Sequence, residues 1–241
     1  EGLWDHAPRF PYVLGSDGAG VVVDVGARVE RFTPGDEVYA AAFGSPKGGT
    51  YAEYLVVNES FVARLPRGVP VEAAATLASD GVTALAGLEK LELKEGESFL
   101  LFGASGGVGH IALQLAHRFG VRICAVVSQT DGVELAKRLK AEAIVEGHDE
   151  AALDSTLPAF APEGYDAALV LAGGERCQQA LSYMRRGGRV AYPNGVEPVP
   201  VIPEGVTTLA YDGIPGPEQF ARLNELIEAG PFHLQVHRFY R

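Results

Sequence analysis

Short apolar runs separated by turn residues fill the first part of the chain. Turns rich in glycine and proline follow one another at 26–27, 33–35 and 47–49. Strands this short and this closely spaced are typical of a small antiparallel β domain. The pattern predicts its strands at 21–25, 37–42 and 50–57.

From Val71 onward, apolar runs alternate with segments of helical period. Residues 71–91, rich in Ala and Leu, predict two helical pieces around Ser79-Asp-Gly81. Buried strands are expected at 98–102, 122–128, 143–146, 165–172, 189–192 and 206–211. Helices are expected at 132–140, 149–157, 176–184 and 218–228, besides one that follows residue 108. This alternation predicts an α/β fold, a doubly wound parallel sheet with helices on both faces.

A glycine triplet lies between the strand at 98–102 and the helix after it. Gly103, Gly106 and Gly109 follow at three-residue spacing, which between a strand and a helix indicates dinucleotide binding. The first glycine permits a tight turn, the second lets the backbone approach a pyrophosphate, and the third allows close packing of helix and strand. A plain structural turn is the alternative. Cofactor contacts are expected from Gly103, Ser105, Gly106, Gly107, Val108 and Gly109.

Composition narrows the classes of partner. The 241 residues carry a formal net charge of -11, which argues against nucleic acid or an anionic membrane as a partner. Two cysteines, Cys124 and Cys177, cannot build a disulfide framework and favour a reducing, cytoplasmic setting. No apolar run reaches the length that spans a bilayer, and no signal peptide is expected.

Several segments together resemble the zinc-free quinone oxidoreductase branch, the ζ-crystallin-like proteins, of the medium-chain dehydrogenase/reductases. They are Pro11–Val22, Gly35–Val38, Gly48–Tyr54, Gly103–Gly109 and Gly187–Val190. The resemblance implies a GroES-like substrate domain at 1–75, a Rossmann domain at 76–230 and a return segment at 231–241. It also implies that about 50 residues before Glu1, and a shorter tail, are absent from this sequence. Such relatives are commonly dimers that pair the edge strands of their sheets, here 206–211.

The resemblance also bears on metals. The zinc-binding branch has Gly-His-Glu where this chain has Gly15-Ser16-Asp17, and four closely spaced cysteines are missing. No metal is therefore expected, and no obligatory catalytic side chain. Without a Lewis acid, the expected reaction is hydride transfer from NADPH to an electron-poor quinone or α,β-unsaturated carbonyl. The alternatives are an enoyl-thioester reductase of the same superfamily and a non-catalytic NADPH-binding protein.

The choice of nicotinamide depends on the end of the second strand. NAD sites place Asp or Glu about 20 residues after the glycine loop, but this strand ends Val127-Ser128-Gln129. The missing acid favours NADP(H), with Ser128 and Thr130 as candidate ligands of the 2′-phosphate. Gly132 replaces a lysine that many relatives carry.

Other candidates come from strand ends and from aromatic residues. Gly173, Tyr192 and Asn194 end later strands at the edge where ligands bind, so they are expected near the cofactor. Tyr12, Phe43 and Tyr51 are candidates for stacking a quinone, with core packing as the alternative for each. Asp80 near the domain junction is expected to cap a helix beside Gly81, with the orientation of a substrate or a water molecule as the alternative.

Overall fold

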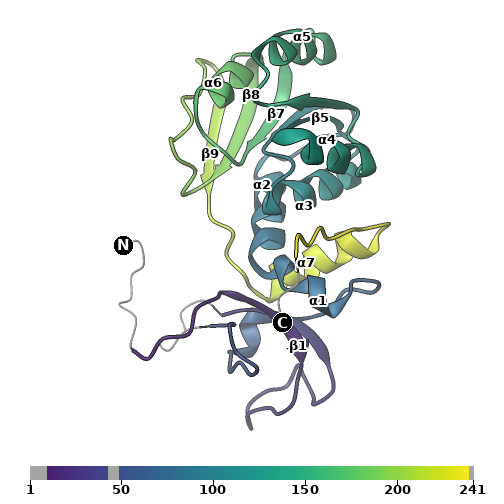
Figure 1. Cartoon of the computed structure of the whole chain (residues 1–241), viewed down its shortest axis with the longest axis vertical. Helices are drawn as coiled ribbons and strands as arrows, with labels where there is room; N and C mark the ends of the chain where they lie inside the picture. Colours follow the sequence, from purple (N-terminus) through teal and green to yellow (C-terminus); the bar gives the residue numbers. More distant parts are fainter. Residues whose placement is uncertain (1–9, 43–48, 239–241) are drawn as a thin grey trace. The chain divides into compact units, whose positions relative to one another are not determined.

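The computed structural model describes residues 10–42 and 49–238 and divides the chain into two compact units. The first unit comprises residues 1–82 and 214–241, and the second comprises residues 83–213. The predicted class is confirmed: the second unit holds a parallel α/β sheet, and the first holds a separate antiparallel sheet (Figure 1).

Three antiparallel strands form the sheet of the first unit, in the order β1 (Asp17–Val21), β2 (Glu37–Ala41) and β3 (Val62–Arg64). The strand expected at 21–25 was placed too late. β1 pairs with β2 over residues 17–21. The chain then leaves the sheet, and the N–H of Val22 donates to the carbonyl of Asp36.

The strand expected at 50–57 is wrong. Its first residues bond another segment: the N–H groups of Thr50 and Tyr51 donate to the carbonyls of Gly15 and Leu14. The rest of the segment is assigned to no strand. A 3₁₀ turn, η1 (Glu59–Phe61), then leads into β3.

Helices complete the first unit. They are α1 (Val71–Ala74), the π-helical turn η2 (Leu77–Gly81) and α7 (Pro217–Glu228). Phe220 of α7 meets the buried ring of Tyr39 edge-on, with 5.2 Å between centroids, and Asn224 accepts a hydrogen bond from the Tyr39 hydroxyl at 2.9 Å. The expected ranges had assigned this helix to the second domain, whereas its apolar face is buried against β2 of the first unit.

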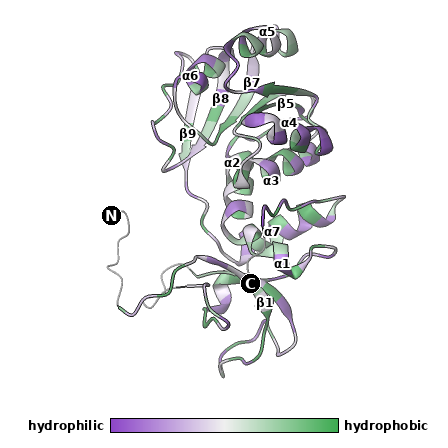
Figure 2. Cartoon of the chain, in the orientation of Figure 1, coloured by the Kyte–Doolittle hydropathy of each residue, from purple (hydrophilic) through white to green (hydrophobic). Residues whose placement is uncertain are grey.

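Six parallel strands form the sheet of the second unit, in the order β6-β5-β4-β7-β8-β9. Their bounds are β4 (Ser98–Phe102), β5 (Arg122–Val127), β6 (Ala143–Glu146), β7 (Tyr165–Val170), β8 (Met184–Pro193) and β9 (Thr207–Tyr211). The central strands β4, β5 and β7 are almost wholly buried apolar runs, and β5 is coloured as strongly hydrophobic in Figure 2. Burial on both faces is what a doubly wound sheet requires.

Helices cover both faces of this sheet. The helices α5 (Glu150–Phe160) and α6 (Glu175–Leu181) share one hydrophobic cluster with alternate residues of the strands, as Leu100, Cys124 and Ala168 show. Figure 1 shows these two helices beside the sheet. The strand residues that alternate with these positions are equally buried. The helices α2 (Val82–Lys90), α3 (Gly107–Ala116) and α4 (Gln129–Arg138) pack against the sheet.

Two element boundaries differ from expectation in ways that matter. The expected helix 176–184 ends at Leu181, and Met184 instead opens β8, which pairs with β7 through an irregular register. The helix expected from residue 132 begins at Gln129. Ser128 is therefore the N-cap of α4, and Thr130 lies in its first turn.

Candidate nucleotide-binding site

The glycine loop leaves β4 through a tight turn. Gly103 has φ +91°, in the left-handed region that L side chains rarely adopt, which explains the glycine there. The amide of Gly106 donates to the carbonyl of Gly103 at 3.1 Å and closes the turn. The chain then enters α3, with Gly106 as its N-cap.

Gly109 allows α3 to pack against this turn. A Cβ at position 109 would lie 2.1 Å from the carbonyl oxygen of Gly103 and 2.8 Å from the Cα of Ala104. Only a glycine fits such an approach of backbone to backbone. The third glycine therefore has the packing role that a dinucleotide-binding loop gives it.

The same geometry directs backbone N–H groups out of the start of α3. Those of Gly107, Val108 and Gly109 belong to the first turn, where a helix has no carbonyl of its own to offer them. Gly106 provides no side-chain cap, and a Cβ there would contact only the carbonyl of Gly103, at 3.5 Å. The loop thus forms a cradle of donors at the positive end of a helix dipole, which suits a phosphate.

Ser105 contacts a second loop at the end of β5. Its hydroxyl oxygen accepts the N–H of Ser128 at 3.1 Å and lies 3.1 Å from the Ser128 hydroxyl. Ser105 was expected to bond a phosphate directly. The structure brings it to Ser128, another candidate, so that these two predicted residues meet although they lie 23 residues apart.

The residues after β5 are uncharged or acidic. Ser128 and Thr130 are exposed, and Gln129 between them has φ +61°. Asp131, which the sequence reasoning passed over, is also exposed, and its carboxylate accepts the N–H of Gly132 at 2.9 Å. This strand end therefore offers hydroxyls and first-turn N–H groups, with one carboxylate in the same turn.

The ends of β7 and β8 lie at the same sheet edge as the glycine loop, because all six strands are parallel. Gly173 follows β7, and a Cβ there would lie 2.1 Å from the carbonyl of Pro198, so the loop after β8 covers it on that side. Tyr192 is partly buried against the cluster shared with α5 and α6. The Asn194 amide donates to Asp212 at 3.0 Å.

The aromatic candidates of the first unit are on its surface. Tyr12 is 41% exposed and Tyr51 is 79% exposed. The ring of Tyr51 lies against Gly15, where a Cβ would come within 2.8 Å of it. Phe43 lies outside the described residues.

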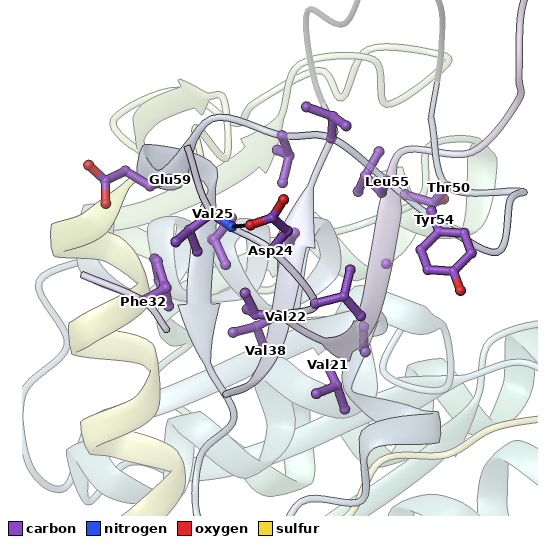
Figure 3. A pocket seen from close by; sticks show the side chains of 18 of the residues that line it. Val21, Val22, Asp24, Val25, Phe32, Val38, Thr50, Tyr54, Leu55 and Glu59 are labelled. Carbon is purple, nitrogen blue, oxygen red and sulfur yellow. Dashed lines mark hydrogen bonds between the residues drawn. The ribbon is translucent and has the colours of Figure 1, made fainter. Parts of the chain in front are cut away.

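A cavity of about 310 Å³ opens between β1, β2 and the segment 50–57 (Figure 3). Its lining is mostly apolar, with valine side chains and Phe32, while Asp24 and Glu59 lie among the lining residues. Neither Tyr12 nor Tyr51 lines it. The cavity therefore does not coincide with the acceptor site expected from the aromatic residues.

Two carboxyl groups meet in the first unit at a place that sequence reasoning missed. The Ser79 hydroxyl donates to Asp17 at 2.5 Å, although the two residues are 62 positions apart. Burial raises the pKa of Asp17 from 3.8 to about 6, helped by the charge of Asp80 and opposed by hydrogen bonds from Ser79 and Ser16. Burial also raises the pKa of Asp80, which lies inside η2 rather than at the helix cap expected for it. The only signal of this site in the sequence was the position of Asp17 directly beside Ser16.

Among the residues that the structure describes, no group of three or more His, Cys, Asp and Glu side chains is placed to hold a metal ion together. No helix in the same residues is both long enough and apolar enough to cross a bilayer.

The family described as alcohol dehydrogenase GroES-like domain matches residues 1–67, and the zinc-binding dehydrogenase family matches residues 107–200. The chain is 34% identical over 229 residues to the 2-methylene-furan-3-one reductase of Solanum lycopersicum, covering 92% of this chain and 55% of the relative. It is 29% identical over 208 residues to the quinone oxidoreductase of Lama guanicoe, covering 86% and 62%. It thus spans little more than half the length of the curated relatives it matches.

Among solved structures, the yhdH oxidoreductase of Salmonella enterica in complex with NADP superposes with a TM-score of 0.70. It is 26% identical and covers 92% of this chain and 72% of its own. The parallel sheet with its glycine loop defines an α/β unit of the dinucleotide-binding type, and the antiparallel sheet defines a separate GroES-like unit. Together with the two family matches and these relatives, they confirm the resemblance to the medium-chain dehydrogenase/reductase superfamily.

Proposed function

We propose that this chain is part of an NADPH-dependent oxidoreductase that transfers hydride to a quinone or an α,β-unsaturated carbonyl without zinc. The geometry of the glycine loop carries the proposal. The left-handed turn at Gly103, the close approach at Gly109 and the open N-terminus of α3 form a cradle that fits a pyrophosphate. In the sequence, the glycines alone account for this cradle.

The chain's own residues suit binding and orientation. The first-turn N–H groups of α3 would hold the pyrophosphate, and Ser128 and Thr130 would meet the adenosine ribose. Gly173, Tyr192 and Asn194 would lie toward the nicotinamide, which supplies the hydride when it is bound. A hydroquinone can take its protons from solvent, so no side-chain acid is required of the protein.

Two observations support NADPH over NADH. No carboxylate stands directly at the end of β5, where it would repel a 2′-phosphate, and the exposed hydroxyls of Ser128 and Thr130 take that place. The Salmonella neighbour was solved with NADP, which agrees with this choice.

The donor set supports zinc independence. The Asp17 carboxylate is engaged by the Ser79 hydroxyl, and Ser16 beside it offers no imidazole. Thiolate and imidazole are the ligands that zinc sites use most, and among the described residues no group of His, Cys, Asp and Glu side chains is placed to hold a metal ion. The names of the tomato and llama relatives support an enone or a quinone as the acceptor.

We place the acceptor in the GroES-like unit, near Tyr12, Phe43 and Tyr51, and the cofactor in the Rossmann-like unit. The expected division at 75/76 stays a prediction: the GroES-like match ends at residue 67, and the first compact unit runs to residue 82. A cytoplasmic homodimer that pairs β9, an edge strand of its sheet, completes the proposal. Light scattering on the whole protein tests the dimer.

The central experiment is a fluorescence titration of the whole protein, with its native termini, with NADPH and NADH. At least tenfold tighter binding of NADPH is expected. Oxidation of NADPH by a small quinone and by an enone is then followed, with and without a chelator. Loss of turnover with chelator would contradict zinc independence, and a preference for enoyl thioesters would favour the thioester reductase. Binding without turnover would favour a non-catalytic protein, and absence of binding would overturn the proposal.

A further inference from the structure

Ser105 connects two loops that meet different parts of a dinucleotide. It lies between β4 and α3, in the loop that would hold the pyrophosphate, while Ser128 ends β5 beside the ribose position. A hydroxyl has one proton and two acceptor sites. The Ser105 hydroxyl oxygen accepts the N–H of Ser128 with one of its acceptor sites. Its proton and its other acceptor site are left for the Ser128 hydroxyl, whose oxygen lies 3.1 Å away.

This pairing changes what Ser128 does. Ser128 is the N-cap of α4, a position where a serine side chain usually accepts a first-turn N–H of its own helix. Here its side chain makes no such cap hydrogen bond. The hydroxyl is held toward Ser105 instead, and both the backbone and the side chain of Ser128 are fixed by one residue of the other loop.

Gly132 provides the space for Ser105. A Cβ at position 132 would lie 2.8 Å from the Cβ of Ser105, 3.0 Å from its hydroxyl oxygen and 3.2 Å from the Cβ of Val127. Residue 132 is buried, so an added side chain could not turn into solvent. The placement of Ser105 against Ser128 therefore requires a residue without a side chain at 132.

The charged side chains close to this strand end in sequence give a 2′-phosphate little help. Asp131 carries a negative charge in the same turn, Arg122 at the far end of β5 lies 3.5 Å from Glu142, and Lys137 pairs with Glu134 at 2.8 Å. Recognition of a phosphate by Ser128 and Thr130 would depend on the positions of their hydroxyl and N–H donors, because a hydrogen bond requires a donor at the right distance and angle.

We propose that Ser105 is a positioning residue for cofactor specificity: it fixes Ser128 for the 2′-phosphate of NADPH, and Gly132 makes room for it. This rests on the proposed function. Ser105 acts through Ser128 and does not need to touch the pyrophosphate itself. Its replacement should therefore weaken binding of the 2′-phosphate and leave binding of the rest of the nucleotide unchanged.

The test uses calorimetric titration of the whole protein with two probes, 2′,5′-ADP and 5′-AMP, which differ by the 2′-phosphate. Ser105→Ala should weaken 2′,5′-ADP about tenfold and change 5′-AMP less than twofold. Ser128→Ala should have the same effect, and the double variant should lose no more than either single variant, since the two residues act as one. Ser155→Ala, an exposed serine on α5, is the matched control and should change neither affinity.

Gly132→Ala is a second variant that disturbs Ser105 from the opposite side. It should weaken 2′,5′-ADP as Ser105→Ala does, and Ser105→Gly in the same chain should recover thermal stability by returning the lost space. This keeps the test decisive if Ser105→Ala folds poorly.

Equal losses for both probes, no loss for either, or additive losses in the double variant would overturn the positioning role while leaving the proposed function intact. A wild-type protein that binds 5′-AMP and NADH but not 2′,5′-ADP would overturn both the NADPH preference and this role. A wild-type protein that binds no nucleotide would overturn the proposed function itself.

Discussion

Replacing Asp17 by asparagine should stabilise the first unit at neutral pH and have little effect in acid. Asp17 lies on β1, where burial raises its pKa from 3.8 to about 6. In the unfolded chain the carboxyl returns to its ordinary value. The folded state therefore binds a proton more tightly than the unfolded state, and stability is lost as pH rises.

The sign and the size follow from these two values. Below about pH 3.8 both states are protonated, and the stability contributed by the protonated group is fully present. It is lost as pH rises toward 6 and stays lost above that. The two values correspond to ~3 kcal/mol at most, and ~1 to 2 kcal/mol after allowance for the partial solvation of the carboxyl. Asparagine has a similar shape and no charge, so it can still accept the Ser79 hydroxyl and should avoid this loss.

The assay is urea unfolding of the whole protein and of Asp17→Asn at a series of pH values from 4 to 8. The difference in unfolding free energy should grow between pH 4 and 6 and remain constant above. Asp24→Asn is the matched control, because that acid is exposed on the same unit and its replacement should change the unfolding free energy little. A constant difference at all pH values, or destabilisation at pH 8, would refute the reasoning.

Three further predictions follow from packing. Gly109→Ala should lower the free energy of unfolding by more than ~2 kcal/mol and abolish nucleotide binding, because the new Cβ would meet a backbone carbonyl at 2.1 Å. Gly26→Ala is the control and should do neither, since a Cβ there has no atom within 4 Å; equal behaviour of the two variants in calorimetry would contradict the geometry. Phe220→Ala should destabilise the first unit by ~3 to 5 kcal/mol, since the ring is buried against Tyr39, and an unfolding change confined to the second unit would refute the placement of α7. Tyr211→Phe should be neutral or stabilising by ~1 kcal/mol in urea unfolding, because its buried hydroxyl has no partner among the described residues; a clear loss would show that the hydroxyl is bonded.

The sequence was sufficient to predict the features that depend on residues adjacent in the chain. The apolar run 98–102 and the spacing of Gly103, Gly106 and Gly109 predicted β4, the turn and α3 within a few residues. The reason is physical: burial of a strand on both faces, a left-handed turn and a helix packed against it each impose a requirement on residues that are adjacent in the chain.

Sequence reasoning failed where a segment's structure depends on a distant partner. The apolar run at 50–57, which follows a turn, predicted a strand, yet a strand exists only where another backbone completes its hydrogen bonds. Helix α7 was identified as a helix, but its period could not show that it packs on Tyr39 rather than on the parallel sheet.

The side-chain pairs at the sites show the same division. Each of Ser105, Ser128 and Gly132 was noted in the sequence, but that the first two bond each other and exclude a side chain at the third is a result of how two loops meet. The Asp17–Ser79 hydrogen bond is likewise made between distant segments. Local periodicity determined the elements and the nucleotide loop, whereas only the tertiary structure, which sets the contacts and burial of residues far apart in the chain, decided how hydroxyls and carboxylates are paired.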